Sequence, residues 1–467
     1  MKFTKPIILV ARLSLPLILS VAFLSLPIIL SLGSLHSREI VVTRFTSSLG
    51  AAYIAAYSIG YALFNLVLSF TSGFTMGLGV VATQKMGRKD YAGVAESMVN
   101  GYFVGTILAI ILGIAVFNAG FVLKFFNESP QLTLLASQFT NILAFATIPV
   151  IIAAISQQFA LLIDQPKYIF IIGLLTVILI IFFSYLFGMG NLGSPQMGMK
   201  GFGLAVLIGA GFECLCWILL ISFHPQFQHF PIRKKILNIK TSMMADILNT
   251  GLPLGIKQII GLNGVIWVFT LLLGKIGAID LAVFQLLLSF ATLSSSIPDG
   301  ISRVMAIKVG NHLGGLRIAL AQQYTNAGFL ITLVVTVLAG LFMIFSPNQL
   351  VGWILTPVGQ EEQQVFQTAV ILLRFTSILV LGSALIMIGY SVLAGFKDTL
   401  FTLIVEVSCM WGIALPVSYF LNQFFHGGVR DYLFGLSLGI IVALAIYIFR
   451  IRYQFKKASQ NIAIVAQ

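Results

Sequence analysis

Four acidic residues lie within long apolar stretches of the sequence, where a charged side chain is costly. They are Glu39, Glu213, Asp299 and Glu406. A carboxyl group in a medium of low dielectric holds its proton more tightly than it does in water, so it can take up and release protons near neutral pH. Ionisable groups at membrane depth usually face a cavity or a partner charge. These residues therefore indicate proton chemistry.

The first of these acids stands in the segment LGSLHSREIVV, beside His36 and Arg38. Glu39 is an ion-coupling candidate, and His36 is its candidate proton partner because an imidazole titrates near neutral pH. The alternative is that SLHSRE forms the first outer loop or a helix end, in which case Arg38 and Glu39 are solvated.

Asp299 is the second ion-coupling candidate. It follows Pro298 in SSSIPDGIS, in the middle of an apolar segment. A Pro–Asp–Gly sequence within a helix frees backbone groups and favours a bend that lines a cavity. The alternative is an acid near the cytoplasmic end of the helix, paired with Arg303 four residues later.

Glu406 in LIVEVSC is a further ion-coupling candidate, and it could pair across two helices with Arg374 in ILLRFTS. A structural ion pair is the alternative to a transport role there. Lys257 lies in the segment GLPLGIKQ. Its stem could reach the cytoplasmic edge, or its amine could be a counter-charge to Asp299 or a contact for an anionic substrate. Glu213 has no evident partner.

A second set of residues could line a path for substrates. It comprises aromatic, amide, basic and related side chains within the apolar segments: Tyr53, Tyr57, Tyr61, Asn65, Lys257, Gln258, Asn263, Phe284, Gln285 and Arg374. Such a lining suits flat amphipathic molecules that bind with little selectivity. The alternative for the aromatic members is helix packing, since large apolar rings commonly fill the interfaces between helices.

The sequence contains no motif that supports an enzymatic function. The three cysteines and five histidines do not show the spacing of metal ligands, and no nucleophile stands beside a base. The glycine-rich run SGFTMGLG lacks the GK[ST] of a phosphate loop and suits close helix packing instead. We therefore expect neither enzymatic activity nor a cofactor.

The composition requires that these residues be held by membrane-spanning helices. Of the 467 residues, 58% are hydrophobic and 9% are charged, and the mean hydropathy is +1.02. Soluble domains carry roughly 25% charged residues, so a soluble globular protein is excluded. A bilayer core needs about 20 apolar residues per helix. Twelve segments meet this need: 14–45, 49–84, 92–119, 133–162, 168–188, 201–223, 243–274, 278–307, 319–345, 363–394, 399–422 and 431–453.

The positive charges set the orientation of these helices. The formal net charge is +13, and most of the 27 Lys and Arg residues fall in alternate loops once the N-terminus is placed in the cytoplasm. Cytoplasmic loops are enriched in Lys and Arg. An even number of helices then puts both termini in the cytoplasm, in a multi-pass protein of the inner (plasma) membrane. The charge therefore marks topology, and we expect no nucleic-acid partner.

The two halves of the sequence resemble each other, with matching residues in the same order. The matches are Gly50 with Gly277, Ala55 with Ala282, Gly73 with Gly300, Gly87 with Gly314, Pro27 with Pro253 within one residue, and Asp164 with Asp398 at a nearby offset. Chance similarity among Gly, Ala and Leu in apolar sequence is the alternative. A repeat of six helices gives both halves the same orientation in the membrane.

The repeat predicts an all-α polytopic membrane protein with 12 transmembrane helices in two six-helix bundles. The bundles are expected to be related by a pseudo-two-fold axis along the membrane normal. The expected divisions are an N-terminal bundle at 1–222, a basic cytoplasmic linker at 223–240, and a C-terminal bundle at 241–467.

Several segments resemble those of the multidrug and toxic compound extrusion (MATE) transporters. The stretches SSLGAAYIAAYSIG (47–60) and GFTMGLGVVATQKMGRKD (73–90) are similar to the second helix of that family and its following loop. The second half repeats them as GKIGAIDLAVFQ and SIPDGISRVMAIKVGNHLGG. Further similar segments are GLPLGIKQ, GSPQMGMKGFGLA, AGFKDT and WGIALPVSYFL.

The resemblance implies a secondary active antiporter that exports amphipathic organic compounds, including drugs, by alternating access. Its implied partners are amphipathic small molecules and the lipid bilayer, and we expect it to act as a monomer. The implied driving force is an inward gradient of protons or of sodium ions.

The sequence departs from the family at the positions where the family carries its coupling residues. Those positions read Val42 or Ser31, Ile178, Phe182, Val206, Gly261 and Ser383. A sodium site needs hard oxygen ligands, which apolar side chains do not supply. A proton is therefore the favoured coupling ion, with sodium as the alternative. Two other functions stay open: a flippase for lipid-linked precursors, and a non-transporting membrane protein that has lost its coupling sites.

Overall fold

The computed structural model describes residues 4–125, 130–235, 238–355 and 359–465, and within these ranges the chain is helical, without strands. Among the residues that the structure describes, eleven helical stretches are long and apolar enough to cross a membrane, and the shorter apolar stretch Leu19–Ser31 lies where the remaining span is expected. The prediction of an all-helical protein that spans the membrane many times is confirmed.

The first half of the chain runs through α1 to α9 and one short π-helix, η1. The bounds are α1 Thr4–Ser48, α2 Ala51–Gly87, α3 Tyr91–Phe117, α4 Ala119–Phe125, α5 Pro130–Leu162, α6 Lys167–Phe183, η1 Ser184–Gly188, α7 Met199–Phe223, α8 Pro225–Gln228 and α9 Ile232–Lys235.

The second half runs through α10 to α18 and a second π-helix, η2. The bounds are α10 Thr241–Ile260, α11 Leu262–Ile276, α12 Ala278–Gly314, α13 Ile318–Phe345, α14 Pro347–Ile354, α15 Gln360–Gly395, α16 Thr399–Cys409, η2 Met410–Ala414, α17 Leu415–Phe425 and α18 Val429–Val465.

The predicted repeat is present in the order and lengths of these elements. Helices α2 and α12 are both 37 residues long, and each begins directly after a glycine N-cap, Gly50 or Gly277. Each is followed by a residue with positive φ, Lys89 at 61° and Leu316 at 58°. The fifth predicted span of each half contains a π-helix of 5 residues, η1 or η2. Chance similarity does not produce such a match.

One pairing within the repeat is off by a residue. The turns after α5 and α15 place positive φ at Asp164 (58°) and Lys397 (61°), so these two residues correspond. The sequence alignment pairs Asp164 with Asp398 instead. The shared acid is misleading because Asp398 is the N-cap of α16, whereas Asp164 occupies the left-handed position one residue earlier in its turn.

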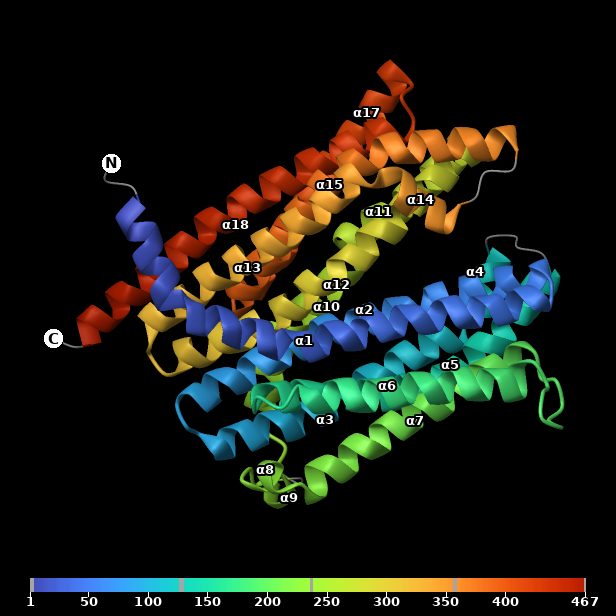
Figure 1. The fold of residues 1–467 in the computed structure, drawn as a ribbon. Helices are drawn as coiled ribbons and strands as arrows, with labels where there is room; N and C mark the ends of the chain where they lie inside the picture. The colour runs from blue at the N-terminus through green and yellow to red at the C-terminus, as the bar shows by residue number, and fades with distance from the viewer. Residues whose placement is uncertain (1–3, 126–129, 236–237, 356–358, 466–467) are drawn as a thin grey trace. The chain divides into compact units, whose positions relative to one another are not determined.

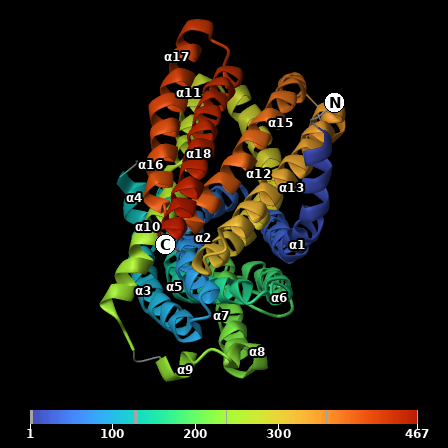
Figure 2. The ribbon, with the colours of Figure 1, turned by 90° about the vertical axis from the view of Figure 1, so that its left-hand side faces the viewer.

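The fourth predicted span of each half is the packing centre of that half. In the first half, α5 contacts α2, α3 and α7. In the second half, the corresponding helix α15 contacts α12, α13 and α18, and these four helices run side by side in both views (Figures 1 and 2). Both centres are rich in buried small and aliphatic residues, which allow helices to approach closely.

The chain forms two compact units. The first unit is Leu30–Gly255, and the second unit comprises Met1–Ile29 and Ile256–Gln467. Both boundaries lie inside a helix, just past Pro27 in α1 and just past Pro253 in α10. The division at 1–222, 223–240 and 241–467 stays a prediction.

The basic segment 223–240 belongs to the first unit, where it is fastened to α3. The carboxylate of Glu96 accepts hydrogen bonds from Lys235 at 2.7 Å and from Lys240 at 2.9 Å. The side chain of Asn100 accepts a hydrogen bond from the backbone N–H of Lys240 at 2.9 Å. These contacts hold the end of the segment on one helix.

Candidate functional site

Glu39 lies on α1 within the first unit and is half-buried. Its carboxylate accepts a hydrogen bond of 2.5 Å from the hydroxyl of Tyr61 on α2. The helix α1 includes residues 36–39, so SLHSRE is helical and not a loop. The side chain of His36, its predicted proton partner, lies outside the described residues.

Tyr61 stands at the edge of an aromatic cluster. Its ring stacks on that of Tyr57 with a centroid distance of 5.7 Å. Tyr57 is itself buried and contacts Phe139 and Phe202, with centroid distances of 5.3 Å and 6.5 Å. Tyr57 therefore packs helices together in this structure, and its predicted place in a substrate cavity stays a prediction. The cluster fixes the ring of Tyr61, which directs its hydroxyl at Glu39.

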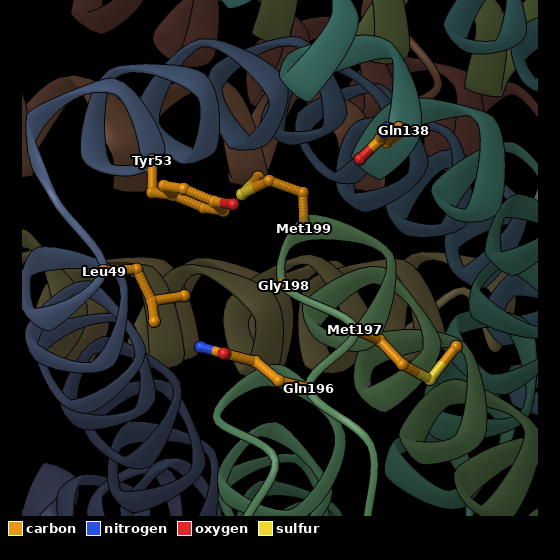
Figure 3. Close-up of a pocket in the computed structure, with 7 residues that line it drawn as sticks. All are labelled: Leu49, Tyr53, Gln138, Gln196, Met197, Gly198 and Met199. Atoms are coloured by element: carbon orange, nitrogen blue, oxygen red, sulfur yellow. The ribbon is translucent and has the colours of Figure 1, made fainter.

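A pocket of about 350 Å³ lies in the same unit, around Tyr53 (Figure 3). Its lining comes from the α1–α2 turn, from α2, from α5, and from the loop before α7 with the first residue of that helix: Leu49, Tyr53, Gln138, Gln196, Met197, Gly198 and Met199. Tyr53 is the predicted cavity residue that the pocket includes. Figure 3 shows its ring extending toward the side chain of Met199. The lining from the segment GSPQMGMKG was not predicted.

Lys257 and Glu406 form a buried ion pair in the second unit. The Nζ atom of Lys257 on α10 lies 2.9 Å from Oε2 of Glu406 on α16. Only 1% of Lys257 and 5% of Glu406 are exposed. Such complete burial of two charges is costly, so each depends on the other.

The pair sits at a break between two helices. Helix α10 ends at Ile260, Gly261 is the N-cap of α11, and Oε1 of Glu406 accepts a hydrogen bond from the first helical N–H, that of Leu262, at 3.2 Å. A Cβ at Gly261 would collide with Oε1 of Glu406 and with the carbonyl of Lys257. Glycine is therefore needed for the carboxylate to reach the helix terminus, where the partial positive charge favours an anion.

An aromatic ring completes the surroundings of the ammonium group. Nζ of Lys257 lies 3.3 Å from the ring centroid of Tyr390 on α15, a cation–π contact. The side chain of Tyr390 also lies near that of Ser302 on α12. On the same helix, Asp299 and Arg303 form an ion pair of 3.0 Å. Tyr390 thus connects two ion pairs that lie far apart in the sequence.

The predicted pairing of Glu406 with Arg374 is wrong. Glu406 lies on the buried face of α16, in a stripe with Thr402 and Cys409. Arg374 lies on the exposed face of α15, among exposed apolar residues that include Ile371. The two charges therefore point into different surroundings.

Two further alternatives are decided by these contacts. Lys257 neither reaches the cytoplasmic edge nor pairs with Asp299, because its amine is held by Glu406. Asp299 forms the i, i+4 pair with Arg303, which was the structural alternative for this acid. Its side chain is 20% exposed, so it is less enclosed than Glu406.

The remaining candidates lie toward the surface or make local contacts. Asn65, Asn263, Gln285 and Arg374 are exposed, and Gln258 is half-buried. The amide of Asn263 donates to the carbonyl of Gln258 at 2.8 Å, and Gln285 donates to the hydroxyl of Thr270 at 3.3 Å. Their role in a substrate path stays a prediction.

The sequence did not reveal several contacts near the candidate residues. Glu213 accepts a hydrogen bond from Gln157 at 2.6 Å, although no partner was expected. Trp411 in η2 donates to the carbonyl of Ile260 at 2.5 Å and thereby satisfies the end of α10. Tyr390 was not singled out at all. Its position in IGYSVLAG, within an apolar segment of small residues, was the available signal.

The sequence is similar to a family model and to known proteins. The model MatE matches residues 27–186 and 253–420, one stretch in each half of the repeat. Probable multidrug resistance protein NorM of Pseudomonas aeruginosa is 26% identical over 402 residues, covering 86% of this chain and 82% of that protein. Its counterpart in Listeria monocytogenes serovar 1/2a is 27% identical over 426 residues, covering 90% and 92%.

Solved structures are similar in fold. A multidrug resistance MATE family transporter of the MOP superfamily, in its outward-facing conformation, matches with a TM-score of 0.85 at 16% identity, covering 94% of this chain and 96% of that chain. The matched model spans most of both halves, in agreement with the segments quoted from the sequence. The chain therefore belongs to the MatE family of multi-span membrane transporters.

Proposed function

We propose that the protein is a secondary antiporter that exports amphipathic organic compounds, including drugs, across the bacterial inner membrane by alternating access. Relatives named as multidrug resistance proteins, similar over most of the chain, support the substrate class. The alternation of basic loops supports a cytoplasmic position for both termini. A monomer is the assembly that we expect.

We propose a proton as the coupling ion and Glu39 as the group that carries it. The observation that supports this is the hydrogen bond between Glu39 and Tyr61. A hydroxyl group is neutral and can either donate or accept a hydrogen bond. Glu39 can therefore gain or lose a proton without leaving Tyr61 with an unpaired charge.

Glu406 and Asp299 are less suited to this task. If Glu406 became protonated, the ammonium group of Lys257 would remain buried without its anion, at a large cost. Asp299 is held by the permanently charged guanidinium of Arg303. Each of these acids is therefore paired with a cationic side chain, whereas Glu39 is hydrogen-bonded to the neutral hydroxyl of Tyr61.

Drug-driven proton release from protein in proteoliposomes tests the proposal. Wild-type protein with an imposed proton gradient should export a cationic dye such as ethidium and release protons on binding it. Glu39→Gln should abolish both proton release and gradient-driven export while it leaves dye binding intact. Glu361→Gln is the matched control, because Glu361 is an exposed acid in the first turn of α15.

Three results would contradict parts of the proposal. Export by wild-type protein that follows a sodium gradient and ignores a proton gradient would exclude the proton. Normal proton release by Glu39→Gln would exclude Glu39. An absence of any coupled flux in folded wild-type protein, with movement of lipid-linked precursors instead, would exclude the antiporter.

A further inference from the structure

The surroundings of the Lys257 ammonium group have the chemistry of a site for a single positive charge. A carboxylate oxygen of Glu406 lies on one side at 2.9 Å, and the π face of Tyr390 lies at 3.3 Å from the same nitrogen. Carboxylates and aromatic faces are both groups that attract cations away from water. The three side chains come from α10, α15 and α16.

The carboxylate is built into the backbone independently of the lysine. Its second oxygen accepts the N–H of Leu262 at the start of α11, and Gly261 leaves the space for it. The N-terminus of α11 favours a negative charge at this place. Glu406 is thus positioned by the helix break and would keep its position if the amine of Lys257 were removed.

Stability alone does not explain the pair. Replacing a buried ion pair with apolar residues of similar volume is often neutral or stabilising, so a buried pair at membrane depth indicates a role beyond folding. Lys257 provides one positive charge at the end of a flexible stem, within a site whose other members are fixed on helices.

We propose that Glu406, Tyr390 and the α10–α11 break form a monovalent-cation site, and that the chain fills this site permanently with its own Lys257 ammonium group. The second unit therefore carries a tethered cation where an ion from solution would otherwise be needed. Its charge state stays constant while the transporter works. This inference does not rest on proton coupling at Glu39, which lies in the other unit.

Removal of the amine should expose the site to small cations. Lys257→Ala leaves a carboxylate, an aromatic face and a vacated volume, into which sodium or methylammonium can enter but choline is too large. The probe is N,N′-dicyclohexylcarbodiimide, which modifies protonated carboxyl groups in apolar surroundings, with the modified residue located by mass spectrometry. Thermal unfolding of the full-length protein in detergent is the second readout.

The expected results differ between the proteins. Glu406 in wild-type protein should remain unmodified whichever salt is present. In Lys257→Ala, Glu406 should be modified in choline chloride, and modification should fall about tenfold when sodium or methylammonium is present at roughly ten times its dissociation constant. The melting temperature of this variant should rise with the same two cations and not with choline. Lys275→Ala, which removes an exposed lysine near the end of α11, should behave like wild type.

Three outcomes would overturn the inference. Ready modification of Glu406 in wild-type protein would mean that the ammonium group does not occupy the site. Modification in Lys257→Ala that no small cation prevents would mean that the site binds only a proton. An equal cation-dependent stabilisation of the double variant Lys257→Ala/Glu406→Gln would place the binding elsewhere. If Lys257→Ala does not fold, Lys257→Gln and the wild-type measurement still decide between these outcomes.

Discussion

Glu39 and Glu406 are both acids within membrane-spanning helices, yet their surroundings differ in two respects. Glu39 is half-buried and is bound by a neutral hydroxyl, that of Tyr61. Glu406 is 5% exposed and is bound by the ammonium group of Lys257. The two acids therefore differ in the charge of their partner as well as in their burial. The charge of the partner decides whether an acid can change its own charge at an acceptable cost.

The largest effect is expected when the anion of the buried pair is removed. Glu406→Gln should lower the free energy of unfolding by about 3–5 kcal/mol, because Lys257 is left charged and unpaired. The double variant Lys257→Met/Glu406→Gln should recover most of that loss. Unfolding in mixed micelles with increasing sodium dodecyl sulfate would measure both. A double variant no more stable than Glu406→Gln would show that the charge balance is not what matters.

A smaller effect is expected at the aromatic ring that covers Lys257. Tyr390→Leu should cost about 2 kcal/mol, since it removes a desolvated cation–π contact. Tyr390→Phe keeps the ring and loses only a buried hydroxyl group, so it should cost about 1 kcal/mol. The same unfolding assay distinguishes them. Equal losses in the two variants would argue against a role for the ring face.

The smallest effect on stability is expected in the first unit. Tyr61→Phe should cost about 0.5 kcal/mol, because a single hydrogen bond to a partly accessible carboxylate is lost. Its effect should instead be seen in transport, as a shift in the pH dependence of drug-driven proton release. A large loss of stability with unchanged pH dependence would make the contact between Tyr61 and Glu39 structural, and the two acids would then be alike.

Much of the fold could be read from the sequence because its signals are local. Glycines such as Gly50 and Gly277 mark helix starts, and they recur in both halves at matching places. Apolar length alone identifies the spans. The candidate acids could also be identified from a local signal, because a charged residue is rare within an apolar segment.

The partners of these acids could not be read in this way. Lys257 and Glu406 are separated by 149 residues, and only the tertiary fold brings their side chains together. Arg374 is closer to Glu406 in the sequence than Lys257 is, and it was therefore the predicted partner. The orientation of α15 about its own axis exposes Arg374 instead. The rotation of a helix depends on all of its neighbours, so the sequence around Tyr390 does not show which side chains its ring contacts.

The places where the chain passes from one unit to the other have a mechanical consequence. Both crossings lie inside continuous helices, α1 and α10, just past Pro27 and Pro253. A continuous helix couples the motions of the segments at its two ends more tightly than a flexible loop does. Proline removes one backbone hydrogen bond and makes bending easiest at that point. Two continuous helices therefore join the units, each with a proline beside the point of crossing, whereas the basic segment 223–240 is held on α3 within one unit.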